Sequence, residues 1–507
     1  MRILGINALN HDAAITLIED NEILFAAHAE RYSGIKNDPN LNLDMFMNMW
    51  DYGTPQKIVY FERPWIKKTR QLYAGQYSEV FTRDNLPQKH LDEVVNKIVE
   101  GCDYKIDEYV DHHLSHASST YFTSPYDESA VVCIDAIGEW DTITIWYAKG
   151  DKLEKRWSMK YPHSLGLWYS AMTQRLGLKP QEDEFILMGM AAWGRQDDDI
   201  QAEMYNDFFG YHNELELSSN LHRGCMDYDL KCYPDDGTEQ WKFDFAANVQ
   251  TICEWQIQKV FRKAKEVVPE TDNMCYSGGV ALNCVANSLV VQNYYPNLWI
   301  LPNPGDAGNS LGCAAHVNKK HINFMTNGAF LGYDIKGEYP VKPVLKELLK
   351  GNLVGVANGR AEFGPRALGN RSLLADPRGK DIKQKMNTIK NRQEFRPFAP
   401  SVLEEHAHEI FDMPTQKSQF MQHVAPCKYP DKYPAICHID NTSRVQTVSK
   451  KDNPGYYRLI KEFYKKTGCP MVLNTSLNIK GQPIVNDEKH AKDFTDKYGV
   501  KVFTGKK

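Results

Sequence analysis

Hydrophobic residues at the start of the chain form short runs of strand length, separated by polar turns. Residues 3–6 are continuously apolar, as in a buried strand, and residues 7–12 form a polar turn. Two more apolar runs, 14–18 and 23–27, follow closely enough in the chain to pair. The pattern predicts an antiparallel meander of three strands.

A similar arrangement returns about 128 residues later in the chain. Residues 131–134 predict a strand, 135–141 a turn with acidic residues and a glycine, and 142–146 a return strand. Such a repeat is typical of the duplicated actin-like (ASKHA) fold, in which paired hairpin turns face a nucleotide across a cleft. Two unrelated hairpins would give the same pattern. The fold class we expect is α/β, with a duplicated actin-like domain first in the chain.

A histidine pair lies at the start of a predicted helix. Asp111 can cap this helix, and the residues after it continue without Pro or Gly. In a helix, His112 and His116 lie one turn apart on one face, where both imidazoles can reach the same cation, whereas His113 points elsewhere. The spacing also arises by chance on amphipathic helices, so further ligands must come from other parts of the chain.

Two aspartates at the ends of predicted elements are candidates for those ligands. Asp135 follows the strand 131–134, and Asp306 lies between glycines on a tight loop before a predicted helix at 310–317. Two imidazoles and two carboxylates, without a thiolate, suit iron(II), manganese or zinc. The residue types do not choose among these metals.

A glycine pair marks a candidate nucleotide site. Residues 274–283 predict a strand that runs through Gly278 and Gly279 into a helix and includes Asn283. Glycine lets backbone amides approach a phosphate or a ribose closely. We therefore expect these residues to lie near a nucleotide.

Cations and amides gather beyond residue 345. The Gly- and Pro-rich residues 328–344 predict a linker between domains, followed by a strand at 353–357. The segments 359–372 and 390–398 are rich in arginine and lysine, and 471–481 is rich in amides and hydroxyls. Guanidinium groups bind phosphate with two parallel hydrogen bonds, so these segments predict an anion site. Solvated loop charge would explain any one segment alone.

The charge balance divides the chain into two parts. With 507 residues the chain is too long for one core, so we expect two domains. Residues 345–507 carry 29 Lys and Arg against 17 Asp and Glu, whereas residues 1–344 carry 31 against 48. A basic C-terminal part suits nucleotides or acyl phosphates, and an acidic N-terminal part suits metal ions or cationic acceptors. Uneven but inert surface charge would give the same balance.

Several features bear on the environment of the protein. No apolar run is long enough for a membrane helix or a signal peptide, and the eleven cysteines include no CxxC pair. We therefore expect a cytoplasmic protein with reduced thiols. An acidic and aromatic insert at 195–245 predicts a lid or an acceptor pocket, although a passive surface excursion is an equal alternative.

Taken together, the motifs resemble one known family over nearly the whole chain. HHLSHAS, SGGVALNCVANS, GDAGNSLG, GRAEFGPRALGNRSLLADPR, FRPFAPSVL and MVLNTSLNIKGQPIV are similar to segments of the O-carbamoyltransferases of the NodU/CmcH type. The resemblance implies an actin-like metal-binding domain at 1–335 and a YrdC-like domain at 345–507. It also implies that the C-terminal domain forms carbamoyl-adenylate from carbamoyl phosphate and ATP, with Mg²⁺, and that the other domain transfers the carbamoyl group to a hydroxyl.

The resemblance also assigns roles to residues of this chain. His112, His116, Asp135 and Asp306 match the family's metal ligands, for which the family implies iron(II). The nucleotide-binding residues would be Gly278, Gly279 and Asn283, and those for carbamoyl phosphate and ATP would be Arg366, Arg371, Lys390, Arg396, Ser476 and Asn478. We expect His11 to act as general base on the acceptor hydroxyl, with Asp12 orienting it or binding the acceptor. A turn histidine that only holds its own loop is the alternative.

Several alternatives stay open at this point. The acceptor can be a small hydroxylated molecule or sugar, or a hydroxymethylated base in DNA. A tRNA threonylcarbamoyladenosine-type enzyme is the nearest enzymatic alternative, and a non-catalytic nucleotide-binding regulator is another. We expect no membrane partner, and the size of the chain is compatible with a homodimer.

Overall fold

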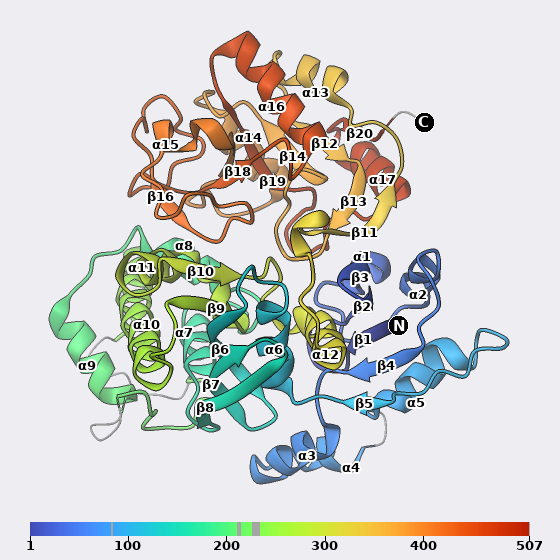
Figure 1. The fold of residues 1–507 in the computed structure, drawn as a ribbon. Coiled ribbons are helices and arrows are strands. Elements are labelled where there is room, and N and C mark those ends of the chain that lie inside the picture. Colours follow the sequence, from blue (N-terminus) through green and yellow to red (C-terminus); the bar gives the residue numbers. More distant parts are fainter. Residues whose placement is uncertain (83–84, 210–213, 226–233, 506–507) are drawn as a thin grey trace.

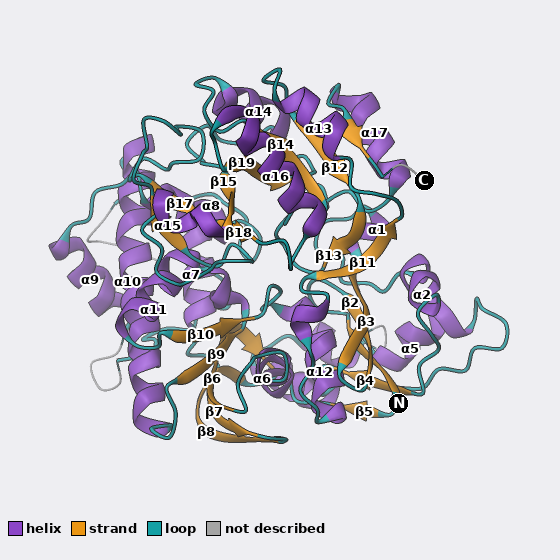
Figure 2. Ribbon diagram, turned by 45° about the horizontal axis from the view of Figure 1, so that its top comes forward, coloured by secondary structure: helices purple, strands orange, loops and turns teal. Residues whose placement is uncertain are grey.

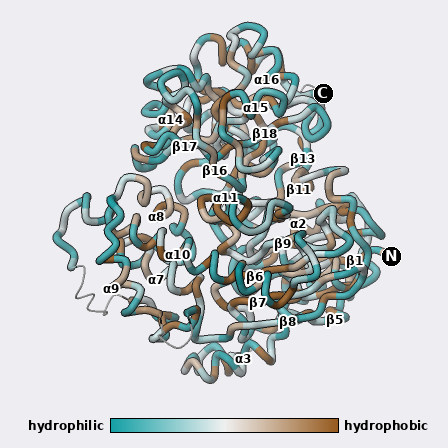
Figure 3. The backbone as a smooth tube through the Cα atoms, turned by 60° about the vertical axis from the view of Figure 1, so that its left-hand side comes forward, coloured by the Kyte–Doolittle hydropathy of each residue, from teal (hydrophilic) through white to brown (hydrophobic). Residues whose placement is uncertain are grey.

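The computed structural model describes residues 1–82, 85–209, 214–225 and 234–505. Two lobes, each built on a five-stranded sheet, lie side by side, and the C-terminal part sits above both in the view of Figure 1. Three hydrophobic clusters are centred on the two lobes and on the C-terminal part. The outer loops are mostly hydrophilic in Figure 3, as expected for segments that surround such cores.

The first lobe contains the predicted meander. Its sheet has the order β3-β2-β1-β4-β5. β1 pairs antiparallel with β2 and parallel with β4, and β2 pairs antiparallel with β3, which confirms the meander. The elements are β1 (Arg2–Asn7), β2 (Ala14–Glu19), β3 (Glu22–His28), β4 (Lys57–Tyr60), β5 (Glu108–Tyr109), α1 (Glu30–Ser33), α2 (Leu43–Trp50), α3 (Pro64–Tyr73), α4 (Tyr77–Phe81), α5 (Pro87–Leu91) and a π-helix at Asp92–Asn96.

The second lobe repeats the topology of the first. Its strand order, β8-β7-β6-β9-β10, has the same succession of antiparallel and parallel pairs as β3-β2-β1-β4-β5. This repetition confirms the duplicated actin-like α/β fold. The elements are β6 (Glu128–Gly138), β7 (Asp141–Lys149), β8 (Lys152–Lys160), β9 (Asn273–Ser277), β10 (Asn297–Ile300), α7 (Leu165–Arg175), α8 (Glu184–Ala191), α9 (Asp198–Phe208), α10 (Glu239–Val267) and α11 (Cys284–Asn293).

Two helices, α6 (His112–Tyr121) and α12 (Asn309–Asn318), lie between the two sheets (Figure 2). The predicted cap is present, because the Asp111 carboxylate accepts a 2.9 Å bond from the amide of Leu114. The helices touch closely at Gly312, where a Cβ atom would lie 1.9 Å from the carbonyl oxygen of Ser115. Each helix begins next to a predicted metal ligand, so their packing fixes the distance between those ligands.

The C-terminal part is a separate α/β unit. Its sheet has the order β18-β15-β19-β14-β12-β20, and its class agrees with the α/β domain we expected, whereas the YrdC-like assignment stays a prediction. The elements are β12 (Val354–Ala357), β14 (Arg371–Ala375), β15 (Ala399–Leu403), β18 (Gln446–Val448), β19 (Met471–Ser476), β20 (Val502–Phe503), α13 (Val341–Leu348), α14 (Ile382–Lys390), α15 (Ala407–Ile410), α16 (Pro454–Thr467), α17 (Glu488–Tyr498) and the pairs β11 (Phe330–Ile335) with β13 (Gly359–Glu362) and β16 (Val424–Pro426) with β17 (Thr442–Arg444).

Two sequence-based expectations need comment. The Gly- and Pro-rich residues 328–344 are not extended chain throughout, because they contain β11 and the start of α13. The insert at 195–245 contains α9 and the start of α10, and its residues 210–213 and 226–233 lie outside the described part of the chain. Within the described ranges, no helix combines the length and the apolarity that crossing a bilayer requires.

Candidate metal and anion sites

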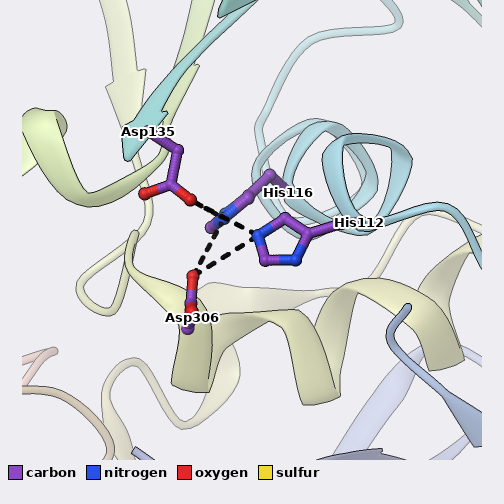
Figure 4. Close-up of side chains that lie close together, drawn as sticks. All are labelled: His112, His116, Asp135 and Asp306. Carbon is purple, nitrogen blue, oxygen red and sulfur yellow. Dashed lines mark ion pairs between the residues drawn. The ribbon is translucent and has the colours of Figure 1, made fainter. Parts of the chain in front are cut away.

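The four predicted metal ligands meet where α6, β6 and the loop before α12 come together (Figure 4). The Nε2 atom of His112 lies 3.4 Å from Asp135 Oδ2 and 3.5 Å from Asp306 Oδ1. The Nε2 atom of His116 lies 3.7 and 3.4 Å from the same two oxygens. All four ligand atoms lie within 4.8 Å of one another, and both imidazoles are fully buried.

Local structure explains how these side chains converge. The i, i+4 spacing on α6 places His112 and His116 on one face. Asp135 precedes Gly138 in β6, and the β6–β7 register shifts between Ile134 and Gly138. Only a glycine fits at position 138, because a Cβ atom there would lie 2.4 Å from the His112 ring.

Each carboxylate turns one oxygen to the imidazoles and has the other oxygen bound elsewhere. The amide of Gly279 donates a 3.1 Å bond to Asp135 Oδ1, and the side chain of Asn10 donates a 3.0 Å bond to Asp306 Oδ2. Such outer contacts orient metal ligands and are a usual part of metal sites. Asn10 was not among the predicted site residues; its place beside His11 in the first turn was the available signal.

The electrostatics of this cluster fit a divalent cation. Burial alone would lower the pKa of His112 and His116, but the two carboxylates raise the pKa of both imidazoles. The imidazoles in turn lower the pKa of Asp135 and Asp306, against the effect of burial. Protons therefore occupy positions that a metal ion can take, and the donor set of nitrogen and oxygen suits the metals named above.

His11 and Asp12 form a pair next to this cluster. The Nδ1 atom of His11 lies 3.0 Å from Asp12 Oδ2, and within the described chain its buried Nε2 atom has no hydrogen-bond partner. Burial lowers the pKa of His11, but its hydrogen bond with Asp12 and the charges of Asp12, Asp306 and Glu182 raise the pKa to about 9. One nitrogen held by a carboxylate and the other without a partner is the geometry of a general base, but the raised pKa keeps the ring protonated near neutral pH, so it must lose that proton before it can act as one.

In the C-terminal unit, the structure brings Lys390, Ser476 and Asn478 together. The buried ammonium group of Lys390, at the end of α14, donates to the Ser476 carbonyl at 2.6 Å and to Asn478 Oδ1 at 2.8 Å. The Ser476 hydroxyl donates a 2.7 Å bond to the same Asn478 oxygen. Burial, together with the charges of Arg392 and Arg396, lowers the pKa of Lys390. The predicted trio is therefore one hydrogen-bonded group.

Four partly buried arginines lie around this trio and repel one another. They are Arg366, Arg392, Arg396 and Arg444, and with Lys390 we call them the cation cluster. Burial and the charges of Arg444 and Arg396 lower the pKa of Arg366 to about 9, and burial and Arg444 lower that of Arg396 to about 10. No described carboxylate lies within ion-pair distance of the cluster. Its positive charge is therefore available to an anion.

The cation cluster lies against the second lobe. The Arg396 guanidinium stacks 4.6 Å over the ring of Phe185 at α8, and the ring of Phe395 packs 5.6 Å from that of Phe243 in α10. The charge of Asp183, which precedes α8, acts on Arg396, and that of its neighbour Glu182 acts on His11. Two adjacent carboxylates of the second lobe thus act electrostatically on Arg396 and on His11.

Two family models match the chain, and together they span both sites. One, described as Carbamoyltransferase N-terminus, covers residues 60–315, and the other, described as Carbamoyltransferase C-terminus, covers residues 345–505. The chain belongs to the carbamoyltransferase family. The four candidate metal ligands lie within the first range, and the cation cluster lies within the second.

Relatives resemble the carbamoyltransferase over most of its length. An uncharacterized protein of Synechocystis is 33% identical over 95% of this chain and 92% of its own, and nodulation protein U of Rhizobium tropici is 27% identical over 96% and 92%. Component A of an Acidaminococcus fermentans 2-hydroxyglutaryl-CoA dehydratase covers 63% of this chain and 98% of its own, with a TM-score of 0.36 and 13% identity. That score is low, so the evidence for the fold is the strand order described above.

The predicted nucleotide residues of the carbamoyltransferase have protein partners. The Gly278 amide donates a 2.9 Å bond to the Pro304 carbonyl, and at φ +91° a Cβ atom would lie 2.2 Å from the Ile134 carbonyl oxygen. The Gly279 amide binds Asp135, as described. The Asn283 side chain caps α11 by accepting from the Ala286 amide. These residues shape the wall behind the metal cluster, and their contact with a nucleotide stays a prediction.

Arg371 differs from the other predicted anion ligands. It is fully buried, and its guanidinium donates to the carbonyls of Asn486, Asn358, Gly359, Asn370 and Tyr333 at 2.9 to 3.1 Å. Those bonds use the donors of the guanidinium and hold four chain segments together. Contact of Arg371 with an anion therefore stays a prediction. Arg392 and Arg444 were not among the predicted site residues, and Arg392 also donates to Asn387 Oδ1 at 2.7 Å and to the Pro397 carbonyl at 2.9 Å.

Proposed function

We propose that this carbamoyltransferase is ATP-dependent and acts on a hydroxyl group in two steps. Carbamoyl phosphate and ATP would form carbamoyl-adenylate in the C-terminal unit, and the actin-like domain would transfer the carbamoyl group to the acceptor. The single observation that carries the proposal is the cation cluster, which brings five positive side chains together without an ion-pair partner in the described chain. Two strongly anionic substrates would offset that repulsion.

The first step places negative charge where the cluster is positive. Carbamoyl phosphate would lose its phosphate to water, and an oxygen of the resulting carbamate would attack the α-phosphorus of ATP. Pyrophosphate, with Mg²⁺ as its counter-ion, would leave. Arg366 and Arg396 would hold the phosphates in line, and the Lys390 trio would orient the small carbamoyl group.

In the second step, the acceptor oxygen would attack the carbamoyl carbon, and AMP would leave. The neutral form of His11, which its raised pKa makes the minor form near neutral pH, would take the proton of that hydroxyl at Nε2, while Asp12 holds the ring through Nδ1. His112, His116, Asp135 and Asp306 would hold a divalent cation, for which the resemblance implies iron(II), and its charge would offset that of the adenylate phosphate. Gly279 and Asn10 would keep the two carboxylates turned towards that cation.

We propose a small hydroxylated molecule or a sugar as the acceptor. A hydroxymethylated base in DNA is the second candidate, which the excess of cations after residue 345 favours. That excess is partly assigned to the phosphates of the first step, so it gives the DNA candidate less support.

The direct test is pyrophosphate release from ATP and carbamoyl phosphate in the absence of acceptor, with mass spectrometry for carbamoyl-adenylate. We expect release that requires both substrates. Release that occurs with threonine and bicarbonate in place of carbamoyl phosphate would identify a threonylcarbamoyl enzyme instead. Metal-loaded, folded protein that releases no pyrophosphate with either pair would refute the adenylate step.

A further inference from the structure

Arg31 is a buried arginine of the first lobe whose protein partners lie in the C-terminal unit. It is in α1 and is 3% exposed. Its Nη2 atom donates to the Glu362 carbonyl at 3.3 Å and to the Gly364 carbonyl at 3.2 Å. Within the described chain its Nε and Nη1 atoms have no hydrogen-bond partner. The bonds that fix this guanidinium therefore all go to the segment that leads from β13 to Arg366.

That segment is short and is held at both ends. We call residues 363–366, between β13 and Arg366, the anion loop. The Glu362 carboxylate accepts bonds from the amides of Leu368 and Asn370 at 2.8 and 2.9 Å, which closes the turn beyond the loop from within the C-terminal unit. Arg31 binds the other side of the loop from outside the unit. Removing Arg31 would leave the loop without its hydrogen bonds to the first lobe.

The anion loop also packs on the loop that carries Asp306, residues 301–306, which we call the metal loop. Gly364 has φ +148°, and a Cβ atom there would lie 2.9 Å from the Pro302 carbonyl oxygen. The Phe363 ring lies 5.1 Å from that of His28, which is 3.1 Å from the Asn303 amide nitrogen. The contact between Gly364 and Pro302 is thus only a few residues from Arg366 in one loop and from Asp306 in the other.

We infer that Arg31 is a positioning residue that couples the anion site to the metal site, because its hydrogen bonds hold the anion loop in contact with the metal loop. The inference rests on the proposed roles of Arg366 and Asp306. A buried cation destabilises the fold unless its contacts offset the loss of hydration, and a planar guanidinium can donate to two carbonyls at once, as here. An anion bound by Arg366 would restrict the anion loop and, through Gly364, the metal loop.

Such coupling is reciprocal and can be measured by binding alone. If phosphate at the cation cluster orders the metal loop, less conformational freedom is lost when Asp306 binds a metal, so the metal binds more tightly. By linkage the metal must tighten phosphate binding by the same factor. The size of this factor should depend on Arg31, although Arg31 lies in neither site.

The experiment uses full-length, metal-free protein and two probes, Mn²⁺ and inorganic phosphate. Free Mn²⁺ is followed by electron paramagnetic resonance with and without saturating phosphate, and a protein-free series corrects for Mn²⁺ held by phosphate itself. We expect phosphate to lower the wild-type Mn²⁺ Kd by about 5-fold or more, the usual lower range of coupling. In Arg31→Met the ratio of the Mn²⁺ Kd without phosphate to the Mn²⁺ Kd with phosphate should fall to about one. In Arg31→Lys it should lie between these values, because an ammonium cannot span both carbonyls in the same plane.

The controls separate coupling from general damage. Arg378→Met removes an arginine that pairs with Asp376 and binds the Thr467 carbonyl inside the C-terminal unit, and it should keep the wild-type ratio. The inference would be overturned if this Kd ratio is one in the wild type, or if Arg31→Met keeps the wild-type ratio. If Arg31→Met does not fold, a wild-type Kd ratio in Arg31→Lys would overturn it. Pyrophosphate release by wild type is measured in parallel. Its absence would count against the proposed function, whereas the Mn²⁺ ratio needs no turnover and still decides the role of Arg31.

Discussion

The hydrogen bond between Asn10 and Asp306 offers a test of the metal site that leaves every ligand in place. Asn10→Ala removes the 3.0 Å bond to Asp306 Oδ2, the oxygen turned away from the imidazoles. A hydrogen bond to a charged group contributes about 1.5 to 3 kcal/mol. Asn10 is exposed, so water can replace part of the bond, and we take the lower value. About 1.5 kcal/mol corresponds to a loss of roughly tenfold in metal affinity, within the usual range for outer contacts of a metal site.

The assay is competition for Mn²⁺ or Co²⁺ between the protein and a fluorescent chelator at fixed pH. The melting temperature should hardly change, because exposed polar substitutions alter stability by less than about 0.5 kcal/mol. Asn318→Ala is the matched control, since Asn318 is a partly exposed asparagine that also donates a side-chain bond, to the Asp20 carbonyl, and it lies at the end of α12 away from Asp306. Unchanged metal affinity in Asn10→Ala would show that Asp306 is oriented by other contacts or is not a ligand.

Three further predictions concern the separate sites. His116→Ala should abolish carbamoyl transfer and lower bound metal while pyrophosphate release persists, as measured by metal analysis and the two half-reaction assays. Arg396→Ala should slow pyrophosphate release by about 10²-fold, because in the proposed reaction it removes a cation that would face the phosphates, and should leave metal content unchanged. Metal affinity should rise with pH, as measured by chelator competition, because the carboxylates raise the pKa of both imidazoles and their protons must leave when metal binds.

The two substitutions have matched comparisons. The exposed His408 and Arg458 of the C-terminal unit, changed to Ala, should behave like wild type in the same assays. Normal transfer by His116→Ala would remove the metal hypothesis, and unchanged pyrophosphate release in Arg396→Ala would mean that the cation cluster binds something else. Metal affinity that is independent of pH across the neutral range would contradict the protonated state we derive for the imidazoles.

Features set by local chemistry could be predicted from the sequence. Asp111 caps α6 through its own side chain, and the four-residue spacing then places His112 and His116 on one face, so this part of the site needed no distant information. The meander of the first lobe followed from three apolar runs with short turns. Asp135 and Asp306 were identifiable because each stands where a predicted element ends.

Features that depend on distant contacts could not be predicted in the same way. Arginine-rich sequence does not distinguish Arg371, which binds carbonyls of four segments, from Arg366, which has no described ion-pair partner. Arg31 binds a loop more than 300 residues away. The strand β11 lay hidden in a Gly- and Pro-rich stretch because pairing with β13, and not local propensity, makes it a strand.

The cation cluster has a consequence for the protein before any reaction begins. Five like charges, one of them buried and four partly buried, repel one another in the folded state, and this repulsion is relieved when the chain unfolds. An anion that binds only the folded form adds stability in proportion to the logarithm of its concentration. If phosphate or nucleotide binds the cation cluster as proposed, the stability of the C-terminal unit should rise with the concentration of that anion in the buffer.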